Sequence, residues 1–193
     1  MKARFHLFAS LLAVGVVMAL LSASVAAANL NSNTANVQFN ATLNESLTVA
    51  VTAGNTVNFT LASNNASNLG STTSTVTTAW VLKPGRANIA VWAYFSSAAA
   101  ALNPTAAGNT VTIPSSAVSV QVNGGAFTPC TTVSPFNAAA SGMQIGTTII
   151  TGVTNLNSNR TDTLAYNIDT TVVPALPADT YTGVLNIQAQ ATP

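Results

Sequence analysis

The chain has 193 residues, of which 48% are hydrophobic and only 5% are charged, and its formal net charge is +1. This balance excludes the basic stripe expected of a protein that binds nucleic acid or an anionic membrane surface. A single cysteine excludes a framework of internal disulfides.

Residues 1–28 have the features of a secretory signal peptide. Lys2 and Arg4 precede an apolar run, LFASLLAVGVVMALL, and the small residues SASVAAAN follow it. The run is shorter than the ~20 residues of a membrane-spanning helix, and it ends in a zone of small residues suited to cleavage. A retained N-terminal anchor is the competing interpretation.

We expect cleavage after Ala28, with Ala26 or Ala27 as alternatives. The only histidine, His6, lies before this point. Three positive and four negative side chains remain after it, a net charge of about −1. We therefore predict a secreted protein, located in the periplasm, at the outer cell surface or outside the cell. No membrane span is expected after cleavage, and no nucleic-acid partner.

Three segments near the start of the mature chain alternate apolar and polar residues, which is the pattern of half-buried strands. They are residues 35–43 (ANVQFNATL), 46–52 (SLTVAVT) and 56–62 (TVNFTLA). Val37 and Phe39 share one face of the first segment. The sequence AGN between the second and third segments predicts that these two form a hairpin.

A second hairpin is predicted after the polar loop at residues 63–74. Its strands are residues 75–82 and 87–95, joined by Lys-Pro-Gly-Arg, in which Pro and Gly occupy the positions that a type II turn favours. In the second strand, positions 89, 91 and 93 share an apolar face, whereas Trp92 and Tyr94 lie on the opposite face.

The rest of the chain contains shorter strand signals. Residues 96–102 predict a loop or one helical turn, and Asn-Gly-Gly at 123–125 is a turn signal. Residues 126–146 are predicted to be irregular, because Pro129 and Pro135 are incompatible with a central strand. Further strands are expected at the following residues: 110–113, 117–122, 147–154, 162–170 and 181–190.

About nine or ten strands with turns between them, and no convincing helix, predict an all-β fold. We expect a single antiparallel β-sandwich, Ig-like or jelly-roll, over residues 29–193. A domain of this length buries roughly 70% of its unfolded surface, so its core needs no disulfide or metal. Cys130 is expected to be a buried thiol, and an intermolecular disulfide is the alternative.

The residues needed for catalysis are nearly absent from the mature chain. Without histidine it cannot form a Ser-His-Asp triad, a Cys-His pair or most zinc sites. Asp162 and Asp169 are about 23 Å apart along one predicted strand, too far to act as a pair. We predict no catalytic residue, no metal and no cofactor, and we expect that the protein is not an enzyme.

Two parts of the sequence carry a resemblance to a known group of proteins. The opening VQFNATLNESLTVAV with TVNFTLAS, and the ending LPADTYTGVLNIQ, resemble secreted bacterial pilin-like and spore-coat-U-like β-sandwich surface proteins. Those families carry a cysteine pair early in the domain, whereas this chain has only Cys130. The resemblance implies an Ig-like sandwich displayed outside the cell and assembled by strand exchange.

Two functions of different classes are therefore expected. The first is a non-catalytic surface-structural protein, a pilus, coat or matrix subunit that pairs through edge strands with itself or other envelope proteins. Residues 35–43 and 181–190 are the candidate exchange strands. The alternative is an extracellular adhesion module that binds carbohydrate or another polymer through aromatic side chains. The candidate contact residues are Val37, Phe39, Trp92, Tyr94 and Tyr181.

Overall fold

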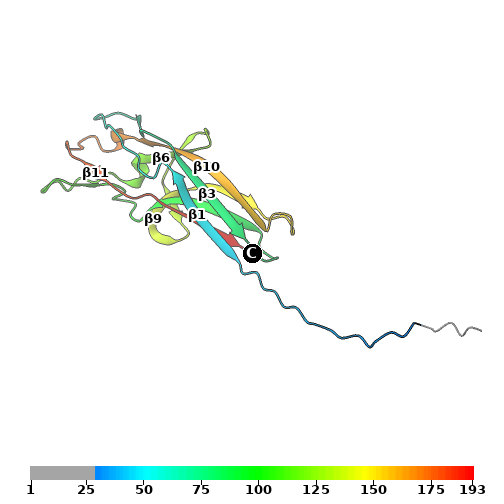
Figure 1. The fold of residues 1–193 in the computed structure, drawn as a ribbon. Helices are drawn as coiled ribbons and strands as arrows, with labels where there is room; N and C mark the ends of the chain where they lie inside the picture. The colour runs from blue at the N-terminus through cyan, green and yellow to red at the C-terminus, as the bar shows by residue number, and fades with distance from the viewer. Residues whose placement is uncertain (1–28) are drawn as a thin grey trace, which may run out of the picture. The chain divides into compact units, whose positions relative to one another are not determined.

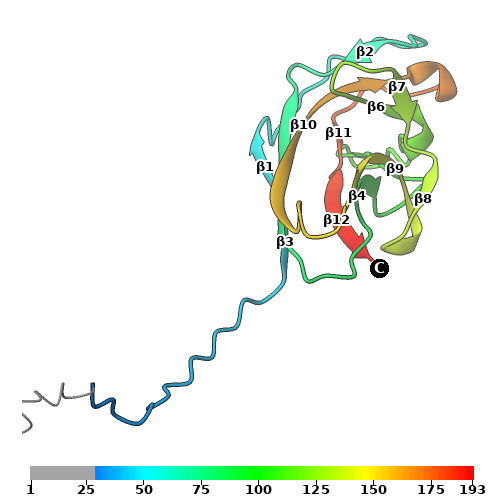
Figure 2. The same ribbon diagram turned by 90° about the vertical axis from the view of Figure 1, so that its right-hand side faces the viewer.

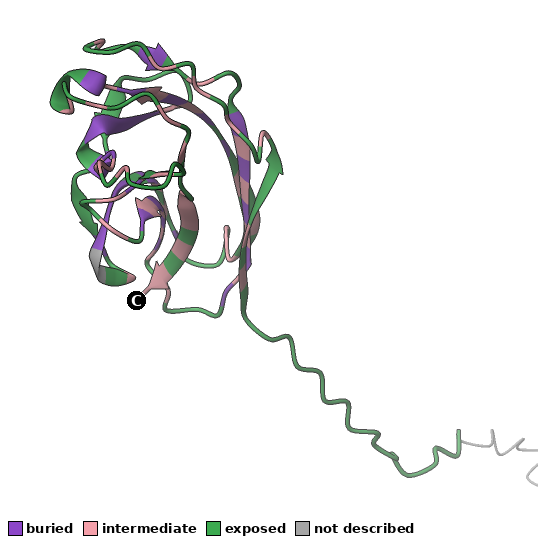
Figure 3. Ribbon diagram, turned by 90° about the vertical axis from the view of Figure 1, so that its left-hand side faces the viewer, coloured by how far each residue is buried: buried purple, intermediate pink, exposed green. Residues whose placement is uncertain are grey.

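A computed structural model describes residues 29–193, apart from the side chains of Ala138 and Ala139. The predicted signal peptide, residues 1–28, lies outside the described residues. The chain divides into two units, Met1–Ala41 and Thr42–Pro193. In the first unit, residues 29–41 are exposed and contain neither helix nor strand (Figure 3).

The strand predicted at residues 35–43 is wrong, because none of these residues belongs to a sheet. Val37 is 77% exposed and Phe39 is 90% exposed. Alternation orients side chains on two faces, but a strand also needs a neighbour to accept and donate its backbone hydrogen bonds. Within residues 29–193, the fold provides no such neighbour for this segment.

The second unit is a sandwich of antiparallel sheets (Figures 1 and 2), so the predicted all-β fold class is confirmed. The larger sheet has the order β1 (Ser46–Ala53), β3 (Ser74–Val81), β10 (Asn157–Ile168), β6 (Val118–Val122) and β7 (Phe127–Pro129), and β2 (Asn68–Leu69) also pairs with β10. The second sheet has the order β12 (Asn186–Thr192), β4 (Asn88–Phe95), β9 (Asn137–Ile149) and β8 (Thr132–Ser134).

Smaller elements complete this unit. β11 (Tyr181–Thr182) pairs with β5 (Asn103–Pro104), and two short 3-10 helices lie at η1 (Ser115–Ala117) and η2 (Thr170–Val172). Residues 96–102 form a loop, which is one of the two predicted alternatives. The strand predicted at residues 110–113 is wrong, because only a single bridge forms there, between Leu102 and Ile113.

The core lies between the two main sheets. Positions along β3 and β4 alternate between buried and half-buried (Figure 3), as the period-two pattern predicts. The predicted inward faces of β4 and β10 are confirmed, because their apolar side chains are all buried. These are Ile89, Val91 and Ala93 on β4 and Leu164, Tyr166 and Ile168 on β10.

The predicted hairpin over residues 75–95 is wrong, although its turn forms and Gly85 adopts a φ of 101°. β3 pairs with β1 and β10, whereas β4 pairs with β12 and β9. The turn therefore carries the chain from one sheet to the other. Turn residues specify a reversal of direction, but whether the two strands share a sheet depends on partners that are distant in sequence.

The first predicted hairpin is wrong for the same reason. β1 pairs with β3, and residues 56–62 form only one bridge, between Phe59 and Gly70. The apolar side chains of this segment still pack against the core, partly buried. Packing alone therefore satisfies their alternation, without a ladder of backbone hydrogen bonds.

Residues 126–146 are not irregular as predicted, because they contain β7, β8 and most of β9. The two prolines do obey the expected rule, since Pro129 ends β7 and Pro135 follows β8, and both strands lie at sheet edges. The error concerns β9, a long strand of small residues that pairs with β4 and buries Met143 and Ile145. Tertiary pairing here overrides weak local β-propensity.

The closing segment is divided between two sheets instead of forming one strand over residues 181–190. A side chain at Gly183 would collide with the carbonyl oxygen of Ala101, so the chain passes another segment closely at the break. β12 pairs with β4 along its whole length, so this candidate exchange strand already has one partner strand within its own unit.

Glu45 links the inter-sheet turn to the start of β1. Its carboxylate accepts hydrogen bonds from Arg86 Nε at 3.1 Å and from the Lys83 backbone N–H at 3.0 Å. Lys83 Nζ lies 3.6 Å from the same carboxylate. The hydrogen bond from Arg86, with a smaller contribution from the Lys83 amide, lowers the pKa of Glu45 to about 2.

We predict a measurable acid dependence of stability from this carboxylate. Because its pKa is about 2 when folded and near 4.5 when exposed, its stabilisation is complete above pH ~4.5 and is lost as the pH falls to about 2. The melting temperature of Glu45→Gln should lie below that of the wild type at pH 6, and most of the difference should be lost at pH 2. Thermal unfolding followed by circular dichroism across this range checks it, and an unchanged difference would contradict it.

Candidate functional site

A cleft of about 650 Å³, lined by polar and apolar groups in similar measure, opens into the second unit between the segment that follows β1 and the segment that leads into β12. Residues 54–61 form one wall and residues 179–187 form the other. Phe95, Val118 and Ile168 contribute to its lining from three different strands. β1 and β12 are the outermost strands of their sheets, so the cleft lies where two sheet edges separate.

The two walls are held by different parts of the fold. Residues 54–61 are attached to residues 70 and 71 by the Phe59 bridge and by a 3.0 Å hydrogen bond from the Asn58 backbone to Ser71 Oγ. Residues 181–182 pair with β5. Within residues 29–193, no backbone ladder joins one wall to the other. The cleft therefore lies at the side of the sandwich, where no backbone ladder connects its two walls.

A polar cluster fixes the second wall. Asp179 accepts hydrogen bonds from Asn109 Nδ2 at 2.7 Å and from the Ala106 backbone at 3.1 Å. Burial raises the pKa of Asp179, but these hydrogen bonds together outweigh burial and lower the pKa. Tyr181 is attached to the same cluster, because its hydroxyl donates to the Pro177 carbonyl at 2.9 Å and accepts from Asn109 at 3.2 Å.

Trp92 and Tyr94 lie elsewhere, on the outer face of β4, and both are half-buried. The Tyr94 ring packs against Phe136 with a centroid distance of 5.8 Å, and its hydroxyl donates to Gln188 Oε1 at 2.9 Å. Phe136 was missed by the sequence analysis, because the segment around it was expected to be irregular.

The five predicted contact residues therefore do not form one site. The structure brings Trp92 and Tyr94 together on one sheet face and puts Tyr181 in the wall of the cleft. Val37 and Phe39 belong to the exposed N-terminal segment. Two surfaces remain as candidates, the edge cleft and the outer face of the four-stranded sheet.

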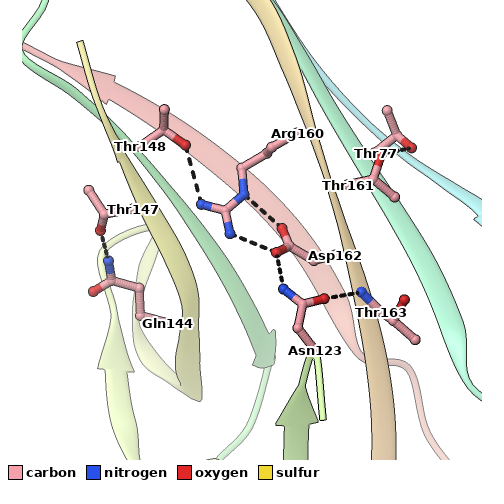
Figure 4. A network of polar contacts seen from close by, with 9 residues as sticks. All are labelled: Thr77, Asn123, Gln144, Thr147, Thr148, Arg160, Thr161, Asp162 and Thr163. Carbon is pink, nitrogen blue, oxygen red and sulfur yellow. Dashed lines mark hydrogen bonds and ion pairs between the residues drawn. The ribbon is translucent and has the colours of Figure 1, made fainter. Parts of the chain in front are cut away.

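Figure 4 shows a polar network between the sheets that the sequence analysis also missed. Arg160 bonds Asp162 through two nitrogens, at 2.6 and 2.8 Å, and reaches Thr148 on β9 at 3.3 Å. Asn123 donates to Asp162 at 2.9 Å. A Cβ at residue 146 would lie 2.6 Å from the guanidinium, so Gly146 admits the arginine. The only sequence signal of this network is an Arg and an Asp that lie two residues apart on an inward strand face.

Other features of residues 29–193 limit the chemistry that they can support. The part of the chain that the structure describes contains no group of three or more His, Cys, Asp and Glu side chains that could hold a metal ion. It also contains no helix with the length and hydropathy needed to cross a membrane. Cys130 is fully buried, as expected, and burial raises the pKa of its thiol to about 12.

No family model matches the chain, and none of the curated proteins or solved structures is significantly similar to it. The resemblance to pilin-like and spore-coat-U-like proteins therefore stays a prediction.

We predict that the Arg160–Asp162 pair stabilises the sandwich strongly. Asp162 is only 1% exposed, so Arg160→Met should leave a buried carboxylate unpaired and lower the free energy of unfolding by about 3 kcal/mol. The double variant Arg160→Met/Asp162→Asn should lose less than the sum of the two single variants. Urea unfolding measures each value.

Thr161→Ala is the matched control, because Thr161 lies between these two residues on the exposed face of β10. It should change the free energy of unfolding by less than about 0.5 kcal/mol. A similar loss in the control, or additive effects in the double variant, would contradict a specific ion pair.

A second prediction concerns the thiol. Because Cys130 is buried and its pKa is raised to about 12, the thiolate that reacts with disulfide reagents is absent at pH 8. Ellman's reagent should release no colour from the folded protein and one equivalent per chain in guanidinium chloride. A non-reducing gel that contained a covalent dimer would contradict this expectation and favour the intermolecular disulfide.

Proposed function

We propose that this protein is a secreted, non-catalytic structural subunit of a pilus, coat or matrix, and that its copies join by pairing between edge strands. The observation that carries the proposal is the exposed apolar alternation in residues 35–43. In this proposal, that segment of one copy adds to an open sheet edge of the next copy.

The N-terminal segment has the properties of a donor strand. Its apolar residues, Val37, Phe39 and Leu43, share the odd-numbered positions and are all strongly exposed. Burying a side chain of the size of Val or Phe contributes about 1.5–3 kcal/mol. Exposed alternating residues of this kind are costly in water and favourable against apolar side chains of another copy, which supports an intermolecular role.

The sandwich has the properties of an acceptor. β1 and β12 are edge strands, and neither contains the Lys or Pro residues that commonly prevent edges from pairing. The cleft beside them is lined by apolar side chains from both sheets, such as Val51, Phe95 and Ile187, together with polar groups in similar measure. Nine extended residues span about 30 Å, enough to follow a strand of ordinary length.

This arrangement favours growth into a chain of subunits. The donor segment and the acceptor edge are different surfaces of one molecule, so their contact is heterologous. A heterologous contact that does not close into a ring continues from copy to copy as a filament. A pilus, coat or matrix is the kind of structure that such a contact builds.

We predict that Val37→Ser/Phe39→Ser abolishes high-mass assemblies of the purified protein, because it removes the apolar side chains of the donor strand. Gln38→Ser/Asn40→Ser is the matched control, since it alters the opposite face of the same segment to the same extent. Light scattering and electron microscopy measure the assembled fraction. A monomeric wild type, or normal assembly of the first variant, would contradict the proposal.

A further inference from the structure

The outer face of the four-stranded sheet has no part in the assembly proposal, and its composition is unusual. The four strands of the smaller sheet, β12, β4, β9 and β8, contain no charged residue at all. Their inward side chains form one side of the core. Their outward side chains therefore form a neutral face, whose chemistry depends on aromatic rings and on polar groups without charge.

Three aromatic side chains follow one another on this face. Trp92 and Tyr94 are two residues apart on the outer side of β4, which separates their Cα atoms by about 7 Å. The Phe136 ring continues the row at 5.8 Å from Tyr94. All three are half-buried, so each ring is supported by the sheet and keeps part of its surface in solvent.

Amide side chains flank the indole on both sides. In the register of the sheet, Trp92 lies opposite Gln188 on β12 and opposite Gln144 on β9, and both glutamines are exposed. Gln188 also accepts a hydrogen bond from Tyr94. A glutamine amide both donates and accepts hydrogen bonds, so these two side chains match the hydroxyl groups of a sugar on either side of the ring.

We propose that this face binds an uncharged polysaccharide with flat sugar rings, such as a β-1,4-linked glucan, through stacking on Trp92 and Tyr94. The C–H face of such a sugar packs on an aromatic ring, and its hydroxyl groups meet the glutamine amides. The absence of charge from all four strands favours a neutral polymer over an acidic one. A protein partner fits less well, since the residues of β12 opposite the outward face of β4 are Asn186, Gln188, Gln190 and Thr192, none of them aliphatic.

The test is depletion of the purified protein from solution by amorphous cellulose. The wild type should be depleted, soluble cellohexaose should compete, and polygalacturonate, an acidic polymer, should not compete. Trp92→Ala should weaken retention at least tenfold, and Trp92→Phe should restore part of it. Phe127→Ala is the control, because Phe127 is an exposed aromatic residue on the other sheet and its loss should leave retention unchanged.

A second measurement uses the wild type and so does not depend on the folding of a variant. Trp80 is only 3% exposed, so acrylamide quenches chiefly the fluorescence of Trp92, and bound cellohexaose should reduce that quenching about twofold. Absence of depletion by cellulose, or equal retention of Trp92→Ala, would overturn the proposal. Concentration-dependent self-association that Trp92→Ala removes, without any glycan effect, would assign the face to contacts between copies.

Discussion

The burial of two inward sheet faces against each other is the constraint on which the rest of this structure depends. Residues from strands far apart in sequence, such as Val76, Val91 and Leu164, become fully inaccessible to water only when the sheets stack. Non-directional burial of this kind supplies most of the driving force for folding. It also explains why the turn after β3 leads into the opposite sheet, since both strands bury their apolar face in one shared core.

Two stacked sheets still have edge strands, and in this protein a cleft opens beside two of these edges. Edges remain at β1 and β12, and beyond them the chain separates into the two walls of the cleft. The larger sheet has an ion pair facing inward, Arg160 with Asp162, and the cleft begins only a few residues further along the same strand, at Tyr166. The buried ion pair and the cleft thus lie at different positions along β10, so assembly at the edge need not disturb the pair.

The two proposed activities use separate surfaces and can be tested independently. Strand pairing would involve the N-terminal segment and the edge cleft, whereas glycan stacking would involve the outer face of the four-stranded sheet. A subunit that displays a neutral aromatic face while joined through its edges would repeat that face along the assembly. Repetition raises the effective concentration of weak sites and strengthens attachment without new contacts.

Local pattern was sufficient to predict the fold class, the inward faces of β4 and β10, the buried state of Cys130 and the outward direction of Trp92 and Tyr94. The inward and outward faces follow from period-two alternation, which depends only on the residues of each strand, whereas the burial of Cys130 was expected from the apolar character of a free thiol. Partner choice was not predictable in this way. Both expected hairpins failed because pairing is decided by distant strands, and β9 was missed because its small residues gain stability only beside β4. Sequence thus determined which side of each strand faces the core, while the tertiary structure decided which strands meet, because only stacking of the sheets buries those sides together.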